Sequence, residues 1–146
     1  MSLAQWQNNG WLRPHATSRE EIGNLLRIAR RDLSDARSQD ISADWRFGIA
    51  YNAALKLCTA LLYAEGYRPT HAQAHYRALQ SLPLILGAER GADARYLEAC
   101  RVKRNAVEYD YVGEATNADA NELIEFTESF ERNVLHWLRE RHPELV

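Results

Sequence analysis

Cysteine is scarce in this chain of 146 residues, and neither sign of charge dominates it. Its two cysteines, Cys58 and Cys100, have no second cysteine or histidine at metal-ligand spacing, so we expect buried free thiols. His71 and His75 stand one helical turn apart, but no carboxylate or cysteine accompanies them, which favours a solvated or structural role. We therefore expect no metal and no cofactor. The formal net charge of −2 gives no overall attraction to nucleic acid or to an anionic membrane, so any basic site has to be local.

Long hydrophobic runs are also missing. The first residues, Met1 to Trp6, lack the basic and apolar regions of a signal peptide. The most apolar stretch, residues 47–64, contains Asn52, Lys56 and Thr59, which are unfavourable in the middle of a membrane span. We expect a cytoplasmic protein that does not cross a membrane.

Apolar residues recur at spacings of three and four without convincing strand alternation, which predicts an all-α protein. Short connections between successive helices favour antiparallel neighbours, and therefore an up-and-down bundle of four or five helices. We expect a single bundle domain over residues 18–141, preceded by an irregular segment, residues 1–17, that Trp6 and Trp11 hold against the bundle. The expected helices are residues 18–38, 42–65, 70–86, 92 to 109 or 111, and 117–141.

Residues at the ends of these segments support the boundaries. Ser18 and Glu21 have the spacing of a capping box, Gly66 can provide a left-handed C-cap, and Thr70 can cap the third helix. Pro83 should kink the last turn of that third helix. The second helix is apolar on nearly every side, which predicts a central position in the bundle.

The run from Arg101 to Tyr111 on the fourth helix carries the main chemical signal. At 100° per residue, we expect Arg101, Asn105 and Tyr109 to form a stripe that faces away from the core. Arginine can hold phosphate through two parallel hydrogen bonds, asparagine can bind a sugar or a base edge, and tyrosine can stack on a base. The residues expected to face the bundle instead are Tyr96, Ala99, Cys100, Lys103, Ala106, Val107 and Asp110.

Two other interpretations of this run remain open. It can be an ordinary solvated helix face, on which Arg101, Arg104 and Glu108 form surface ion pairs. Val102 and Tyr109 can instead contact the same helix of a second copy across a two-fold axis. Because the run contains no histidine, binding is better supported than acid–base catalysis.

Three features of the sequence resemble the HEPN superfamily of small helical domains found in toxin–antitoxin and RNA-processing systems. They are residues 47–54 continuing to residues 65–67, His75 ahead of Leu79 and Leu82, and Arg104-Asn105 followed by Tyr109-Asp-Tyr111. The resemblance covers about residues 18–138 and implies a HEPN-like bundle that acts as a homodimer.

In active members of that family, an arginine is followed after four to six residues by a histidine, and paired motifs form a metal-independent ribonuclease site. Arg104 matches the arginine, whereas Tyr109 stands at the position of the histidine. Tyr111 resembles a tyrosine that a small partner nucleotidyltransferase modifies in some toxin members.

The sequence therefore predicts a homodimeric protein of toxin–antitoxin type that binds nucleotide, RNA or a partner protein. Its expected binding residues are Arg101, Arg104, Asn105, Tyr109 and Tyr111. The first alternative is an endoribonuclease toxin, in which Arg104 and Tyr109 are catalytic. The second alternative is a bundle that serves protein interaction alone.

Overall fold

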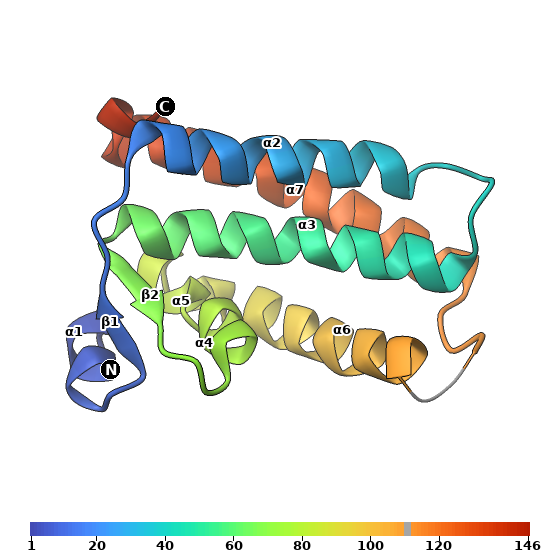
Figure 1. Cartoon of the computed structure of the whole chain (residues 1–146), viewed down its shortest axis with the longest axis horizontal. Helices are drawn as coiled ribbons and strands as arrows, with labels where there is room; N and C mark the ends of the chain where they lie inside the picture. Colours follow the sequence, from blue (N-terminus) through green and yellow to red (C-terminus); the bar gives the residue numbers. More distant parts are fainter. Residues whose placement is uncertain (110–111) are drawn as a thin grey trace.

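Four long helices form an up-and-down bundle (Figure 1). The computed structural model of the chain describes residues 1–109 and 112–146, without the side chain of Tyr109. The long helices are α2 (Arg19–Ala36), α3 (Ala43–Ala64), α6 (Gly91–Tyr109) and α7 (Asn117–Arg141). The predicted all-α bundle is therefore confirmed, and all four long helices begin and end within two residues of the expected positions.

Helix α3 is the centre of the bundle. It packs against α2, α6 and α7, and its buried side chains include Phe47, Leu57 and Leu61 (Figure 1). Among the described residues, α3 alone is long and apolar enough to cross a membrane, but 67% of that apolar window is buried inside the protein. A core helix with neighbours on most sides has this composition, as its sequence predicted.

The N-terminal segment differs from the prediction. Residues 1–17 are not irregular throughout, because they contain α1 (Leu3–Asn8) and a short strand, β1 (Leu12–Pro14). Strand β1 pairs antiparallel with β2 (Tyr67–Pro69), so that Arg13 lies opposite Arg68. Strands of three residues are too short to show alternation, which is why the sequence did not reveal them. Trp6 is buried with Leu12 of β1 and Leu62 of α3, so it holds the N-terminal segment against the bundle, as expected.

The third predicted helix, residues 70–86, is wrong in both its start and its course. Thr70 does not cap a helix; its hydroxyl donates to the carbonyl of Gly10 at 3.0 Å. Helix α4 (Ala74–Gln80) begins after Gln73, which has a left-handed φ of 56°. The chain then breaks at Ser81, and α5 (Leu82–Leu86) carries Pro83 in its first turn, where a missing N–H costs no helical bond. The turns η1 (Ala88–Arg90) and η2 (Pro143–Leu145) precede α6 and follow α7.

The predicted end signals are mostly correct. Ser18 accepts a hydrogen bond from the Glu21 backbone, and Gly66 has a φ of 92° at the end of α3. The capping box is not complete, because the Glu21 carboxylate does not bind the backbone of Ser18. It accepts a hydrogen bond from the Thr17 hydroxyl and contacts His15 at 2.6 Å. This contact ties the start of α2 to the segment that follows β1.

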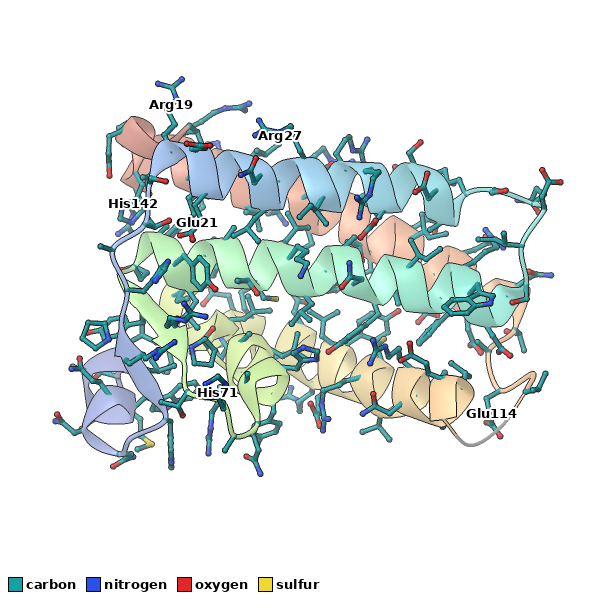
Figure 2. All side chains as sticks on the ribbon, in the orientation of Figure 1. Arg19, Glu21, Arg27, His71, Glu114 and His142 are labelled. Atoms are coloured by element: carbon teal, nitrogen blue, oxygen red, sulfur yellow. The ribbon has the colours of Figure 1, made fainter. Side chains whose placement is uncertain are left out.

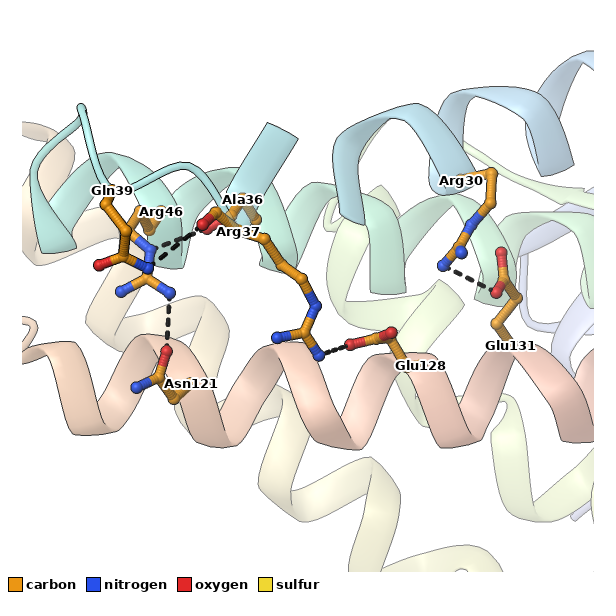
Figure 3. A network of polar contacts seen from close by, with 8 residues as sticks. All are labelled: Arg30, Ala36, Arg37, Gln39, Arg46, Asn121, Glu128 and Glu131. Atoms are coloured by element: carbon orange, nitrogen blue, oxygen red, sulfur yellow. Dashed lines mark hydrogen bonds and ion pairs between the residues drawn. The ribbon is translucent and has the colours of Figure 1, made fainter. Parts of the chain in front are cut away.

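Arg46 of α3 joins three parts of the chain at one end of the bundle. Its side chain is buried and donates to the Ala36 carbonyl at 2.8 Å, to Asn117 at 3.2 Å and to Asn121 at 2.6 Å. Figure 3 shows it beside two ion pairs that connect α2 and the residue after it to α7, Arg30–Glu131 and Arg37–Glu128, whose arginines are more than half exposed. The buried arginine satisfies the last carbonyl of α2, which no residue of that helix can reach.

We expect Arg46→Met to lower the free energy of unfolding by about 3 kcal/mol, because it leaves the buried carbonyl of Ala36 without a donor and removes two partly buried hydrogen bonds to α7. Arg30→Met is the matched control and should cost less than about 1 kcal/mol, since this arginine is 57% exposed and can be replaced by water at Glu131. Urea unfolding followed by circular dichroism measures both values. Equal losses in the two variants would contradict the role assigned to Arg46.

Candidate functional site

Helix α6 is rotated relative to the prediction, although Cys100 is buried and Tyr96 and Val107 pack against the core as expected. Leu97 and Cys100 are buried, whereas Ala99, which was expected to face the core, is exposed. Arg101 and Arg104 lie within about 40° of Leu97 around an ideal helix, so they border α3 and α4 and do not face outward. The predicted outward position of Arg101 is therefore wrong. The prediction gave too much weight to alanines and left out Leu97, the most apolar residue of this helix.

Arg104 is held on the inner side of α6. Its guanidinium carbon lies 5.6 Å from the centre of the Tyr51 ring, and its side chain is 23% exposed. Nε pairs with Glu108 at 3.0 Å, and Nη1 donates to the amide oxygen of Asn105 at 3.2 Å. Tyr51 is 1% exposed, and this burial raises the pKa of its phenol. The buried ring and the two polar partners fix the direction of the arginine.

Arg101 borders a cavity of about 750 Å³ between α4 and α6. Its guanidinium makes two hydrogen bonds to Glu98, at 2.7 and 2.9 Å, and one side chain on α4 that lines the same cavity is His75. His71, labelled in Figure 2, lies beside this cavity, while Glu114 lies at the opposite end of α6.

The charges around His75 come from two helices. This histidine is exposed at the cavity rim. The pKa of His75 is lowered below the usual 6.5 by partial burial of the ring and by the nearby positive charges of Arg104, Lys56 and Arg101. His75 is therefore neutral at pH 7, with cations nearby, and an anion bound among them would favour its protonated form.

Two further cations complete this part of the surface. Lys56 comes from the open side of α3, and Arg77 of α4 lies over the indole of Trp11 at 3.7 Å from the ring centre. Neither makes an ion pair with a carboxylate in residues 1–109 or 112–146. We call the surface formed by the following five residues the α3–α4–α6 face: Lys56, His75, Arg77, Arg101 and Arg104.

The structure brings together only part of the predicted binding set. Arg104 and Asn105 are in contact, and Arg101 lies one turn away on the same helix. Tyr109 ends α6, but its side chain lies outside the described residues, as does Tyr111 altogether. The sequence prediction omitted Lys56 and Arg77. A usable signal existed, because Lys56 is the one charged residue between Phe47 and Ala64.

The cysteines have no place on this face. Cys58 and Cys100 are buried free thiols, as predicted, and burial raises the pKa of both, to about 11 for Cys100. Within the described part of the chain, no group of three or more histidine, cysteine, aspartate or glutamate side chains is arranged to hold a metal ion.

Comparison of the chain with protein-family models, with curated proteins and with solved structures finds no match. Any function therefore has to be inferred from the side chains themselves.

We expect Arg104→Gln to raise the pKa of His75 toward its ordinary value, because the substitution removes a positive charge that opposes protonation of the ring. Titration of the imidazole protons by NMR measures the change. Arg37→Gln, which removes the same charge at the contact between α2 and α7, should leave the pKa of His75 unchanged. A wild-type pKa at or above 6.5 would contradict this account of the site.

Proposed function

We propose that the protein is a HEPN-like helical domain that binds single-stranded RNA through the α3–α4–α6 face. The observation that carries the proposal is the convergence of Lys56, His75, Arg101 and Arg104 from three helices. Cations on rigid helices, with little acidic charge left unpaired among them, suit a phosphate backbone. The net charge of −2 then limits RNA to this local surface.

Aromatic side chains beside the cations support RNA over an isolated anion. Arg77 contacts Trp11, and its guanidinium carbon lies 5.4 Å from the ring centre of Tyr76. Bases of single-stranded nucleic acid stack on aromatic rings and on arginine planes, whatever their sequence. Phosphate contacts on α6 and stacking on α4 would together follow a strand across the face.

The resemblance to HEPN domains extends the proposal to a homodimer in a toxin–antitoxin system with a small nucleotidyltransferase as partner. The outward side of α6 supports a contact with a second copy, since Ala99 is exposed there and Val102 is 57% exposed. Small apolar residues on one exposed helix face allow two such helices to approach closely across a two-fold axis.

One observation favours a second candidate function, a metal-independent endoribonuclease. His75 lies within electrostatic reach of Arg104, and its lowered pKa keeps it neutral at pH 7. In that role His75, and not Tyr109, accepts the proton of a ribose 2′-hydroxyl while the 2′-oxygen attacks phosphorus and the bond to the 5′-oxygen breaks. Arg104 stabilises the added negative charge on the phosphate.

For the binding function, we expect Arg101→Gln combined with Arg104→Gln to weaken RNA binding about tenfold or more at low salt. The dependence of affinity on salt should also become shallower, by about 1.4 in the log–log slope, because two phosphate contacts are lost. Fluorescence anisotropy with a single-stranded RNA of about 16 nucleotides measures both quantities.

The matched control for this experiment is Arg30→Gln combined with Arg37→Gln, which removes the same charge from the contact between α2 and α7. If both double variants lose affinity equally, binding is nonspecific and the proposed face is wrong. If the wild-type protein does not bind RNA, the function itself is wrong.

For the ribonuclease candidate, total RNA is incubated with each variant in the presence of a metal chelator. Cleavage should disappear in Arg104→Ala and in His75→Gln, should persist in His71→Gln, and should leave 2′,3′-cyclic phosphate ends. Equal and negligible cleavage by all four proteins, the wild type included, would reject this candidate and leave RNA binding as the function.

A further inference from the structure

A second cavity lies on the other side of Arg104, between α3 and α6. Its volume is about 470 Å³, which falls within the range of about 300–1,000 Å³ usual for small-ligand sites. Its lining combines an apolar wall with polar side chains along its length, from Asp44 at the start of α3 to Asn52 further along that helix, and such a mixture suits a small organic ligand that has both apolar and polar parts. The residues that the argument uses are Trp45, Gly48, Ile49, Asn52, Arg104 and Val107.

Gly48 deepens this cavity. It lies in the first half of α3, where glycine is less favourable than alanine because it loses more backbone entropy on folding. A Cβ at this position would meet no other atom within 4 Å, so packing inside the protein does not require glycine there. The missing side chain instead leaves open space on the wall of the cavity, next to an apolar helix surface.

The walls of the cavity suit a flat ring. Trp45 is 61% exposed, an unusual state for so large an aromatic side chain, and it lines the cavity together with Ile49 of the same helix. Val107 lines it from α6. An indole and two branched aliphatic side chains offer a planar heteroaromatic ligand both stacking and dispersion contacts.

The amide of Asn52, on one wall of the cavity, has a fixed orientation. The amide nitrogen of Asn52 donates to Asp32 at 2.6 Å, and the carboxylate of Asp32 is also bound by Arg31, at 3.0 Å and 3.1 Å. Because an ionised carboxylate only accepts hydrogen bonds, Asn52 has to present its NH₂ group to Asp32. The amide oxygen and one N–H then remain for a ligand, and this is the pair with which asparagine recognises the N6 and N7 edge of adenine.

Arg104 connects this cavity to the phosphate contacts described above. The carboxylates around the cavity are mostly engaged elsewhere: Asp44 accepts from the backbone of Gly113 at 2.7 Å and of Ala115 at 3.1 Å, and Asp32 is held as described. Glu108 alone among the described lining residues pairs with Arg104, at 3.0 Å. A ligand phosphate would therefore compete with Glu108 for this arginine.

We infer that the α3–α6 cavity is a base-binding subsite for an adenine nucleotide, with the ring beside Trp45 and Gly48, its polar edge on Asn52 and its phosphate on Arg104. This inference rests on the proposed function and adds a base preference to it. The nucleotide is either free or a single unstacked base of a bound RNA strand, and the two sources place the same groups in the same cavity.

The test compares Gly48→Leu with Gly48→Ala. Adenosine 5′-monophosphate is titrated into each protein by calorimetry, and ribose 5-phosphate serves as the probe that lacks a base. Gly48→Leu fills the cavity and should lower the affinity for adenosine 5′-monophosphate about tenfold, as expected when a stacked base is lost, without changing the weak affinity for ribose 5-phosphate. Gly48→Ala should fold at least as stably as the wild type, and its loss of affinity should be smaller.

A third variant tests whether Arg104 binds the phosphate of the ligand. Glu108→Gln removes the competitor for Arg104, so the affinity for adenosine 5′-monophosphate should rise. A fall would mean that the cavity prefers a cationic ligand and would overturn the inference. A short oligoadenylate and an oligouridylate of equal length separate the two sources of the base. If the subsite accepts a base of a bound RNA strand, the wild-type protein should bind the oligoadenylate more tightly than the oligouridylate. Gly48→Leu should abolish this preference.

The outcomes separate this inference from the proposed function. If RNA binds through Arg101 and Arg104 but Gly48→Leu binds adenosine 5′-monophosphate and oligoadenylate as the wild type does, the base subsite is wrong and the RNA-binding function stands. If the wild-type protein binds neither RNA nor adenosine 5′-monophosphate, both proposals fail.

Discussion

Burial of α3 is the constraint on which the rest of the structure depends. This helix is apolar on nearly every side, and its removal from water supplies much of the hydrophobic free energy of the fold. Helices α2, α6 and α7 cover most of it, and the two-stranded sheet with α1 covers its C-terminal end (Figure 1). A gap remains in this cover, with α2 on one side and α4 and α6 on the other. The partly exposed residues of α3 lie along the gap, among them Gly48, Asn52 and Lys56. The candidate sites lie along this gap because it is the one side of the central helix that the described neighbours leave accessible.

Arg104 occupies the middle of that gap, between two cavities of different chemistry. The cavity beside α4 contains His75 and is bordered by cations, whereas the cavity beside the start of α3 is lined by Trp45 and aliphatic side chains. A nucleotide combines these two requirements in one molecule, because its phosphate is anionic and its base is flat and largely apolar. The buried ring of Tyr51 beneath Arg104 holds the guanidinium in place between the two cavities. This arrangement explains how a chain with a net charge of −2 can offer a local site to a polyanion.

The sequence was sufficient to predict the long helices, because their apolar period and end signals such as Ser18, Ser42 and Gly66 act locally. It was insufficient for α1, β1 and β2, which are short and are held by contacts between distant residues, such as the hydrogen bond from Thr70 to Gly10.

The sequence identified the candidate residues on α6, but it did not correctly predict the direction in which their side chains point. Alanines carry little information about which face of a helix is buried, and only the packing of Leu97 against the core fixes the rotation that turns Arg101 toward α4. Arg77 was missed because its proximity to α6 depends on tertiary structure, whereas Lys56 was missed although its isolation in an apolar helix was a usable signal. The resemblance to HEPN domains remains a proposal.

The most direct test of the central claim locates bound RNA on the protein surface. Single-stranded RNA that contains 4-thiouridine is crosslinked to the wild-type protein by ultraviolet light, and the modified peptides are identified by mass spectrometry. The account predicts crosslinks within residues 73–77 of α4 and 98–107 of α6, and on Trp11, whose ring Arg77 covers. Crosslinks confined to the outer surfaces of α2 and α7, or their absence under conditions in which a known RNA-binding protein is labelled, would contradict it.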